Sequence, residues 1–164
     1  MIRMLTGIAL VLAATSAQAH YGMIIPSDPM VEPDEERVVN LQISFSHPFE
    51  GIGMELVRPT AFGVVVDGEE EDLLDALAPA TVMDHPAFAL DYRLVGPGAN
   101  VFFLEPQPYW EAAEDAFIIH YTKTYVAAFG DDEGWDTPLG LKTEIVPLSK
   151  TFALWSGNVF QGIV

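Results

Sequence analysis

Residues 39–47 read Val-Asn-Leu-Gln-Ile-Ser-Phe-Ser-His, and apolar and polar side chains alternate along them. An alternation with a period of two predicts a half-buried β-strand, because successive side chains of a strand point to opposite faces. His47 continues the apolar face of this strand at its end. Pro48 follows and is expected to end the strand pairing, since proline has no N–H to donate.

Similar short segments follow along the chain, separated by turn residues. Further strands are predicted at residues 61–66, 88–94, 101–105, 117–125, 141–146 and 159–164. Asp67-Gly68 suits a tight hairpin turn, and Gly96-Pro97-Gly98 predicts that strand 88–94 turns back to pair with strand 101–105. Residues 73–77 predict one helical turn. We therefore expect an all-β protein, an antiparallel β-sandwich of the immunoglobulin-like kind.

The first 19 residues have the layout of a secretory signal peptide. Arg3 precedes an apolar run from Leu5 to Ala14, and Ala17-Gln18-Ala19 is a small-x-small cleavage site. The apolar run is shorter than the roughly 20 residues of a membrane-spanning helix. We expect residues 1–19 to be removed, leaving residues 20–164 as one exported β-sandwich domain without a membrane span, located in a bacterial periplasm. The alternatives are an uncleaved anchor or a buried first strand.

The charge balance is strongly acidic. The chain has 24 acidic and 7 basic residues, for a net charge of −17 at pH 7. Such a surface repels nucleic acid and anionic lipid and attracts small cations, although solubility explains it equally well. Cysteine is absent from the sequence, which excludes disulfides and thiolate metal ligands. The sequence also has no glycine-rich phosphate loop, no G-x-S-x-G and no H-E-x-x-H, and we expect no enzymatic activity.

His20 becomes the first residue if the signal peptide is cleaved after Ala19. Its free α-amine and its imidazole Nδ1 could then chelate one metal ion, which an internal histidine cannot do. One further histidine would supply a third nitrogen, in the arrangement called a histidine brace. Imidazole is a common ligand of nickel, copper and zinc. The sequence therefore predicts a metal site at the new amino terminus.

His47 and His120 are the candidates for the remaining nitrogen ligands. His47 lies where the apolar face of its strand ends, and it is equally well interpreted as a hydrogen-bonded rim histidine. His120 lies within the predicted strand 117–125, and its direction depends on which face of that strand meets the core. His85, between Asp84 and Pro86, is interpreted as a turn residue.

Acidic and aromatic side chains near these histidines are weaker candidates. The acids Glu105, Glu111 and Asp115 flank the loop that leads to His120, and Glu50 follows His47. We interpret these acids as solvent-facing. Tyr109, Trp110 and Trp135 could wall a pocket, with packing in the core as the alternative.

Stretches around all three histidines resemble a known bacterial family. The clearest are Ala19-His20-Tyr21-Gly22-Met23-Ile24-Ile25-Pro26-Ser27, Ser46-His47-Pro48-Phe49-Glu50-Gly51 and Phe117-Ile118-Ile119-His120-Tyr121-Thr122-Lys123. They are similar to a periplasmic nickel uptake family, the periplasmic component of cobalt/nickel-type ABC transport, much of which is described only as a domain of unknown function.

The resemblance implies an exported β-sandwich that delivers Ni²⁺ or Co²⁺ to a membrane importer of the ABC or energy-coupling-factor type. It implies His20, His47 and His120 as the metal ligands. Members of the family continue beyond the segment that matches residues 157–162, into a further β-rich module. The resemblance therefore implies a chain shortened at its C-terminus.

Two other functions stay open. One is a copper enzyme of the histidine-brace type that oxidises a polymer, with Tyr109, Trp110 and Trp135 on one plane with His20. Cu²⁺ fits both as the cargo of a transport protein and as the cofactor of such an enzyme, because the Irving–Williams order favours Cu²⁺ over Ni²⁺ at a nitrogen-rich site. The other is a structural or partner-binding sandwich, for which we expect histidines more than about 10 Å apart, well beyond metal–ligand distances.

Overall fold

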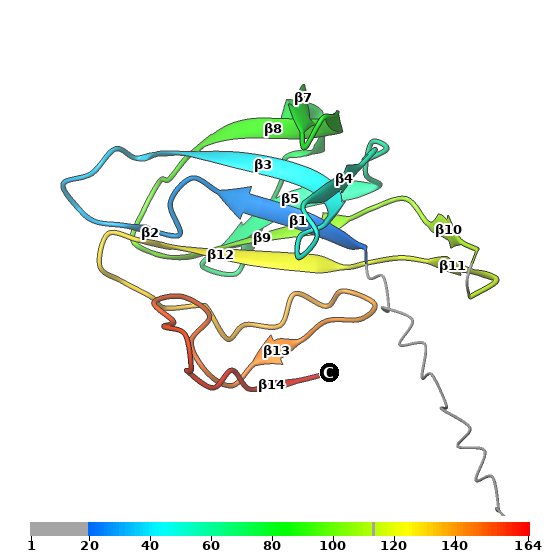
Figure 1. Ribbon diagram of the computed structural model, residues 1–164. Helices are drawn as coiled ribbons and strands as arrows, with labels where there is room; N and C mark the ends of the chain where they lie inside the picture. The colour runs from blue at the N-terminus through cyan, green and yellow to red at the C-terminus, as the bar shows by residue number, and fades with distance from the viewer. Residues whose placement is uncertain (1–19, 113) are drawn as a thin grey trace, which may run out of the picture.

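We describe residues 20–112 and 114–164 of the protein in a computed structural model (Figure 1). The predicted signal peptide, residues 1–19, lies outside the described residues. The described residues form two five-stranded sheets and two small hairpins. The predicted all-β sandwich is confirmed.

The first sheet is built on the strand predicted from residues 39–47. β3 (Val38–His47) pairs with β1 on one side and with β8 on the other. The strand order is β1-β3-β8-β7, and β4 pairs with the end of β3 beyond β8. Every pairing in this sheet is antiparallel. The other members are β1 (Tyr21–Pro26), β4 (Ile52–Met54), β7 (Ala78–Val82) and β8 (His85–Arg93).

The second sheet has the order β2-β12-β9-β5-β6. Its strands are β2 (Met30–Val31), β5 (Ala61–Val66), β6 (Glu69–Asp72), β9 (Gly98–Glu105) and β12 (Thr122–Ala128). Only the short β2–β12 pairing is parallel among these described strands. The predicted turn at Asp67-Gly68 joins β5 to β6, and both residues have positive φ, 51° and 78°, as a tight hairpin turn requires. The acidic run after this turn is therefore an exposed edge strand.

The hydrophobic core lies between the two sheets. Val39, Leu41 and Ile43 of β3 are fully buried, as the alternation predicts. They share one apolar cluster with side chains of the second sheet, which include Phe62, Val64, Phe102, Leu104 and Val126. Burial of a large apolar side chain stabilises a fold by about 1.5–3 kcal/mol relative to exposure. This core therefore fixes the position of β3, whose far end carries His47.

β1 connects the two sheets along one edge. It pairs with β3 and also lies beside β12 of the second sheet (Figure 1). The hydroxyl of Thr122 donates to the carbonyl oxygen of Gly22 at 2.7 Å, and that of Thr124 donates to the carbonyl oxygen of Ile24 at 2.9 Å. A Cβ at Gly22 would lie 3.3 Å from both Leu104 Cδ2 and Thr122 Oγ1. Glycine therefore permits this close approach, which brings the start of β12 next to the start of β1.

Two short hairpins lie outside the sandwich. β10 (Tyr109–Glu111) pairs with β11 (Ala116–Ile118), and β13 (Val146–Pro147) pairs with β14 (Gly162–Ile163). The β10–β11 hairpin projects at the end of the molecule where β1 begins (Figure 1). The predicted helical turn is a short 3₁₀ helix, η1 (Leu74–Ala76). Within residues 20–112 and 114–164, no helix has the length and apolar character needed to cross a membrane.

Two of the predicted strand arrangements were wrong. β9 does not pair with β8, because the segment 96–98 carries the chain from one sheet to the other, where β9 pairs with β5 and β12. The predicted strand 117–125 is broken at residues 119–121. Its first part pairs with β10 in the projecting hairpin, and its second part begins pairing with β9 at Thr122. The chain has to bend between these two partners.

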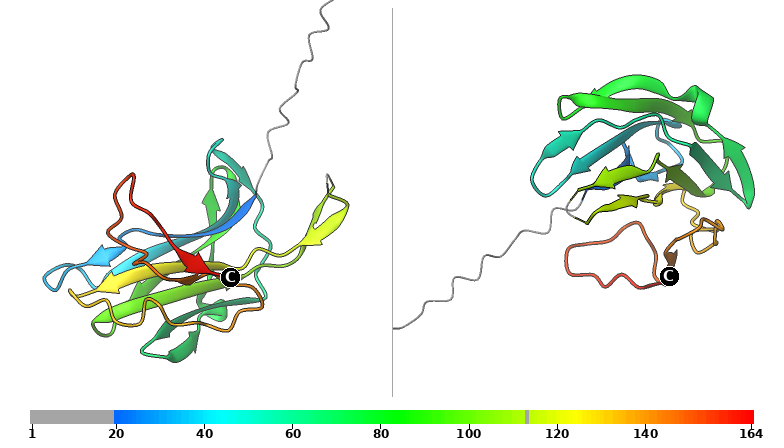
Figure 2. Two further views of the ribbon diagram at one scale, coloured as in Figure 1. Left: turned by 90° about the horizontal axis from the view of Figure 1, so that it is seen from below. Right: turned by 90° about the vertical axis from the view of Figure 1, so that its right-hand side faces the viewer.

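The segment after β12 forms an additional layer outside the second sheet (Figures 1 and 2). The strand predicted at 141–146 was wrong except for Val146, the first residue of β13, and the strand at 159–164 is reduced to β14. The Glu144 side chain accepts hydrogen bonds from the backbone N–H groups of Leu139 and Gly140 and from Lys123 Nζ at 2.7 Å. The chain wraps around this carboxylate instead of extending.

Candidate functional site

Strand register brings His20 and His47 together. β1 pairs antiparallel with β3, with Tyr21 opposite Ser46, so the residue before Tyr21 lies at the level of the residue after Ser46. The imidazole rings of His20 and His47 are 4.0 Å apart, measured between their centroids. His47 is 7% exposed although it ends its strand. This separation does not fit the widely spaced histidines expected of a sandwich without a metal site.

His120 lies at the same end of the sandwich as His20 and His47, and its segment leads into the second sheet. It lies in the break between β11 and β12, and it is therefore not within a strand as predicted. The two threonine hydroxyl bonds from β12 to β1 hold the adjoining chain against the start of β1. The His120 ring lies 6.2 Å from the ring of Tyr21 and 5.4 Å from that of Tyr109, between centroids.

Phe45 and Tyr109 pack between the histidines. The Tyr109 ring lies 5.7 Å from His20 and 5.0 Å from Phe45. The Phe45 ring stacks on His20 at 5.6 Å and lies 6.2 Å from His120. We call His20, His47, His120, Phe45 and Tyr109 the histidine cluster. Its three histidines come from three separate segments of the chain.

Glu111 also lies at the histidine cluster, contrary to its interpretation as a solvent-facing loop acid. Its Oε2 is 3.4 Å from His20 Nδ1, and the two side chains are 19% and 14% exposed. The reason is that residues 109–111 form β10, in which side chains two apart share a face. The Tyr-x-Glu spacing is the available signal, but the prolines of this segment favour a loop in the sequence.

The environment favours neutral imidazoles. Burial lowers the pKa of His20, the neighbouring His47 lowers it further, and Glu111 partly opposes this shift. Burial and the proximity of His20 likewise lower the pKa of His120. Both rings are therefore mostly neutral at pH 7, and neutral imidazole is the form that ligates metals.

Two of these imidazoles have buried nitrogens without a hydrogen-bond partner among the described residues. The nitrogens are Nδ1 of His20 and Nδ1 of His120. His20 Nδ1 is near Glu111 Oε2, but the pair is not aligned as a hydrogen bond. A buried polar atom without a partner costs about 1–3 kcal/mol. The donor set of nitrogens with a nearby carboxylate suits a borderline divalent cation, which would satisfy these atoms.

The side chains of the histidine cluster are not arranged as a complete coordination sphere. Among residues 20–112 and 114–164, no group of three or more His, Cys, Asp or Glu side chains is already arranged to hold a metal ion. In the chain as described, the nitrogen of His20 is still an amide bonded to Ala19, so the amine–imidazole chelate predicted from the sequence requires processing. Side-chain rotation at the cluster is required as well.

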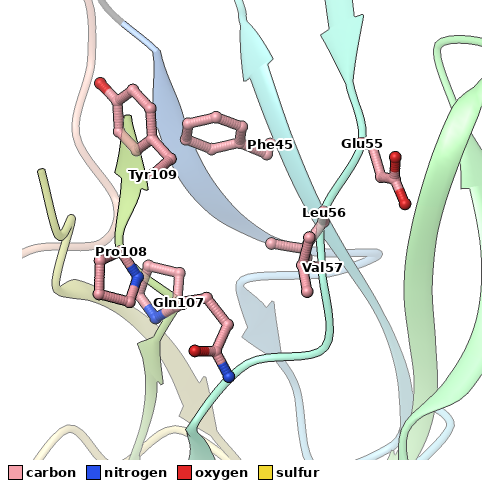
Figure 3. Close-up of a pocket in the computed structure, with 8 residues that line it drawn as sticks. Phe45, Glu55, Leu56, Val57, Gln107, Pro108 and Tyr109 are labelled. Carbon is pink, nitrogen blue, oxygen red and sulfur yellow. The ribbon is translucent and has the colours of Figure 1, made fainter. Parts of the chain in front are cut away.

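A small apolar cavity of about 70 Å³ adjoins the histidine cluster (Figure 3). Phe45 and Tyr109 belong to the cluster and also line this cavity. Leu56 and Val57 line the opposite side, and Pro108 precedes Tyr109.

Other candidates do not join the cluster. His85 is exposed on β8. The loop that carries Trp135 is held at the opposite end of β9 from His120, where the N–H of Ala99 donates to the carbonyl oxygen of Glu133. Trp110 is about half exposed near His20, but Trp135 does not share its surface. Tyr109, Trp110 and Trp135 therefore do not lie together on one plane with His20.

Comparisons with known proteins bear on the family alone. No curated protein and no solved structure matches the chain. A family described as Domain of unknown function (DUF4198) matches residues 17–164. This match covers nearly the whole chain and includes the segments that carry all three histidines of the cluster. The chain therefore belongs to the DUF4198 family.

Proposed function

We propose that this protein captures Ni²⁺ or Co²⁺ outside the cytoplasm and passes the ion to a membrane importer. The ligands are the α-amine and imidazole of His20 after removal of residues 1–19, together with the imidazoles of His47 and His120. The protein catalyses no reaction in this role. Cu²⁺ is a competing cargo, because it binds nitrogen-rich sites more tightly than Ni²⁺.

One observation carries the proposal. Three of the four histidines in the sequence gather at one end of the sandwich, and two of them keep a buried nitrogen without a hydrogen-bond partner in the described protein. A core that needed only apolar packing would gain nothing from these unsatisfied atoms. The acidic surface supports the proposal further, since it raises the local concentration of cations.

The direct test is native mass spectrometry of the chain that begins at His20, titrated with Ni²⁺, Co²⁺ and Cu²⁺. The matched control is the same chain with one glycine added before His20, which converts the His20 α-amine into an amide and changes little else. We expect one tightly bound ion on the first protein and weaker binding on the second. Equal binding by both would place the site on internal histidines, and no binding by either would overturn the proposal.

A competition experiment distinguishes Ni²⁺ or Co²⁺ from Cu²⁺ as the transported ion. A chain that retains Ni²⁺ or Co²⁺ in the presence of an equal concentration of Cu²⁺ would support delivery of those ions. Complete replacement by Cu²⁺ at equal concentrations would follow from affinity alone and would shift the assignment to copper.

A further inference from the structure

The β10–β11 hairpin presents two chemically different faces. Along β10, Tyr109 and Glu111 point toward the histidine cluster, where their contacts are made. Trp110 points the other way and packs against Phe117 of β11, with ring centroids 5.1 Å apart. The hairpin belongs to neither five-stranded sheet. Its inner face therefore meets the histidines, and Tyr109 on that face also packs against the core.

The position of the Glu111 carboxylate matches that of a second ligand on a shared ion. Its Oε2 lies 3.4 Å from His20 Nδ1 without forming a hydrogen bond. Two ligands bound tetrahedrally at about 2.0–2.1 Å lie about 3.3 Å from each other. An ion between these two atoms would give His20 Nδ1 the partner that it lacks, and the carboxylate would offset part of the ion's charge.

We propose that Glu111 is an oxygen ligand of the metal ion, supplied to the histidine site by the β10–β11 hairpin. This inference rests on the proposed function and adds to it a basis for selectivity. A carboxylate is a hard donor that favours divalent ions, whereas Cu⁺ prefers softer ligands. Glu111 therefore biases the site toward Ni²⁺, Co²⁺ or Cu²⁺ and against Cu⁺.

The test compares the affinities of four chains that begin at His20. These are the unchanged protein, Glu111→Gln, Glu111→His and the control Glu114→Gln, which removes the same charge from the exposed turn of the same hairpin. Each is titrated with Ni²⁺ against a competing chelator and, without oxygen, with Cu⁺. We expect Glu111→Gln to weaken Ni²⁺ binding by about tenfold or more and to leave Cu⁺ binding nearly unchanged, with Glu114→Gln like the unchanged protein.

Glu111→His separates a ligand from a residue that only orients His20. Histidine can replace the carboxylate as a ligand, so we expect it to restore Ni²⁺ affinity. A purely orienting role predicts the reverse, because glutamine keeps a hydrogen-bond acceptor whereas histidine removes the carboxylate. Retention of Ni²⁺ by Glu111→Gln, with loss in His47→Ala and His120→Ala, would overturn the role of Glu111 alone. Absence of Ni²⁺ binding in the unchanged protein would overturn the proposed function as well.

A second measurement covers the case in which a variant folds poorly. In the unchanged protein labelled with ¹³C, the side-chain carboxyl signal of Glu111 should shift on addition of Zn²⁺, and that of Glu114 should stay in place. A shift of both signals or of neither would contradict a specific ligand at Glu111.

Discussion

The rings of His20 and His47 lie 4.0 Å apart because β1 and β3 pair in a register that sets Tyr21 opposite Ser46. A slip of two residues in this register would move His20 by about 7 Å along β3. Strand pairing therefore controls the proposed metal site at least as much as the presence of the two histidines does.

Replacement of the cluster histidines should weaken metal binding selectively. We expect His47→Ala and His120→Ala each to weaken Ni²⁺ binding by tenfold or more, because each removes an imidazole ligand (about 1.4 kcal/mol per factor of ten). His85→Ala, at an exposed position on β8, should bind as the unchanged protein does. Calorimetric titration of chains that begin at His20 measures this. An equal loss in all three variants would show that the site is not at the cluster.

The threonine bonds between β12 and β1 should support both stability and the site. Thr122→Val keeps the side-chain shape but removes the hydroxyl that donates to Gly22, and we expect a loss of about 1 kcal/mol in the free energy of unfolding. Ni²⁺ affinity should also fall, because β12 positions His120. Urea denaturation and metal titration measure the two effects.

Thr81→Val is the matched control for that change, since Thr81 is exposed on β7. Thr81→Val should alter neither the free energy of unfolding nor the Ni²⁺ affinity. If Thr122→Val lost stability but kept full affinity, the hydroxyl bonds would not position His120.

The ion pair of Lys123 and Glu144 should make the free energy of unfolding depend on pH in the acidic range. The two side chains are 8% and 10% exposed and meet at 2.7 Å. Burial alone would raise the pKa of Glu144, but the hydrogen bonds from Lys123, Leu139 and Gly140 outweigh it and lower the pKa below its ordinary value of 4.5. The carboxylate therefore contributes stability above this ordinary value, and that stability is lost as the pH falls through the lowered pKa.

Glu144→Gln tests this acid dependence. At pH 7 we expect a loss of about 3 kcal/mol, because Lys123 keeps a buried charge without its partner. Below pH 4 the difference in free energy of unfolding between the variant and the unchanged protein should become smaller. Glu70→Gln, on the exposed edge strand β6, is the control and should change little. A difference in free energy of unfolding that stayed constant from pH 7 to pH 3 would contradict a lowered pKa of Glu144.

Leu41 should carry a large share of the core energy. Its side chain is fully buried at the centre of β3, so Leu41→Ala should cost about 3 kcal/mol in the free energy of unfolding. Leu148→Ala removes the same atoms from an exposed position and should cost far less. Chemical denaturation of both variants provides the comparison, and similar losses would mean that β3 is not the centre of the core.

Local patterns were sufficient for the elements that depend on neighbours in sequence. The alternation at residues 39–47 predicted β3 and its buried face, and Asp67-Gly68 predicted the β5–β6 turn. Both follow from side-chain direction and from the backbone angles that glycine and aspartate tolerate. The position of His20 directly after a small-x-small triplet likewise singled it out as a candidate ligand.

The choice of partner for each strand could not be obtained from such patterns. β9 leaves its neighbour in sequence for β5 and β12, and the β-prone stretch at 117–125 is divided between two partners. Side-chain periodicity shows that a strand is present and which face is buried, but long-range packing selects the strand beside it. For that reason His120 and Glu111 were correctly placed only in the folded chain.

The amino-acid sequence alone thus defined a β-sandwich, its central strand and the three histidines, because these depend on residue type and short spacing. The three-dimensional fold brought the three histidines to one end of the sandwich and added Glu111 through the short strand β10. The physical reason is that strand register and the crossing between sheets join residues distant in the chain. Those contacts arise from the packing of the whole core and not from any one stretch.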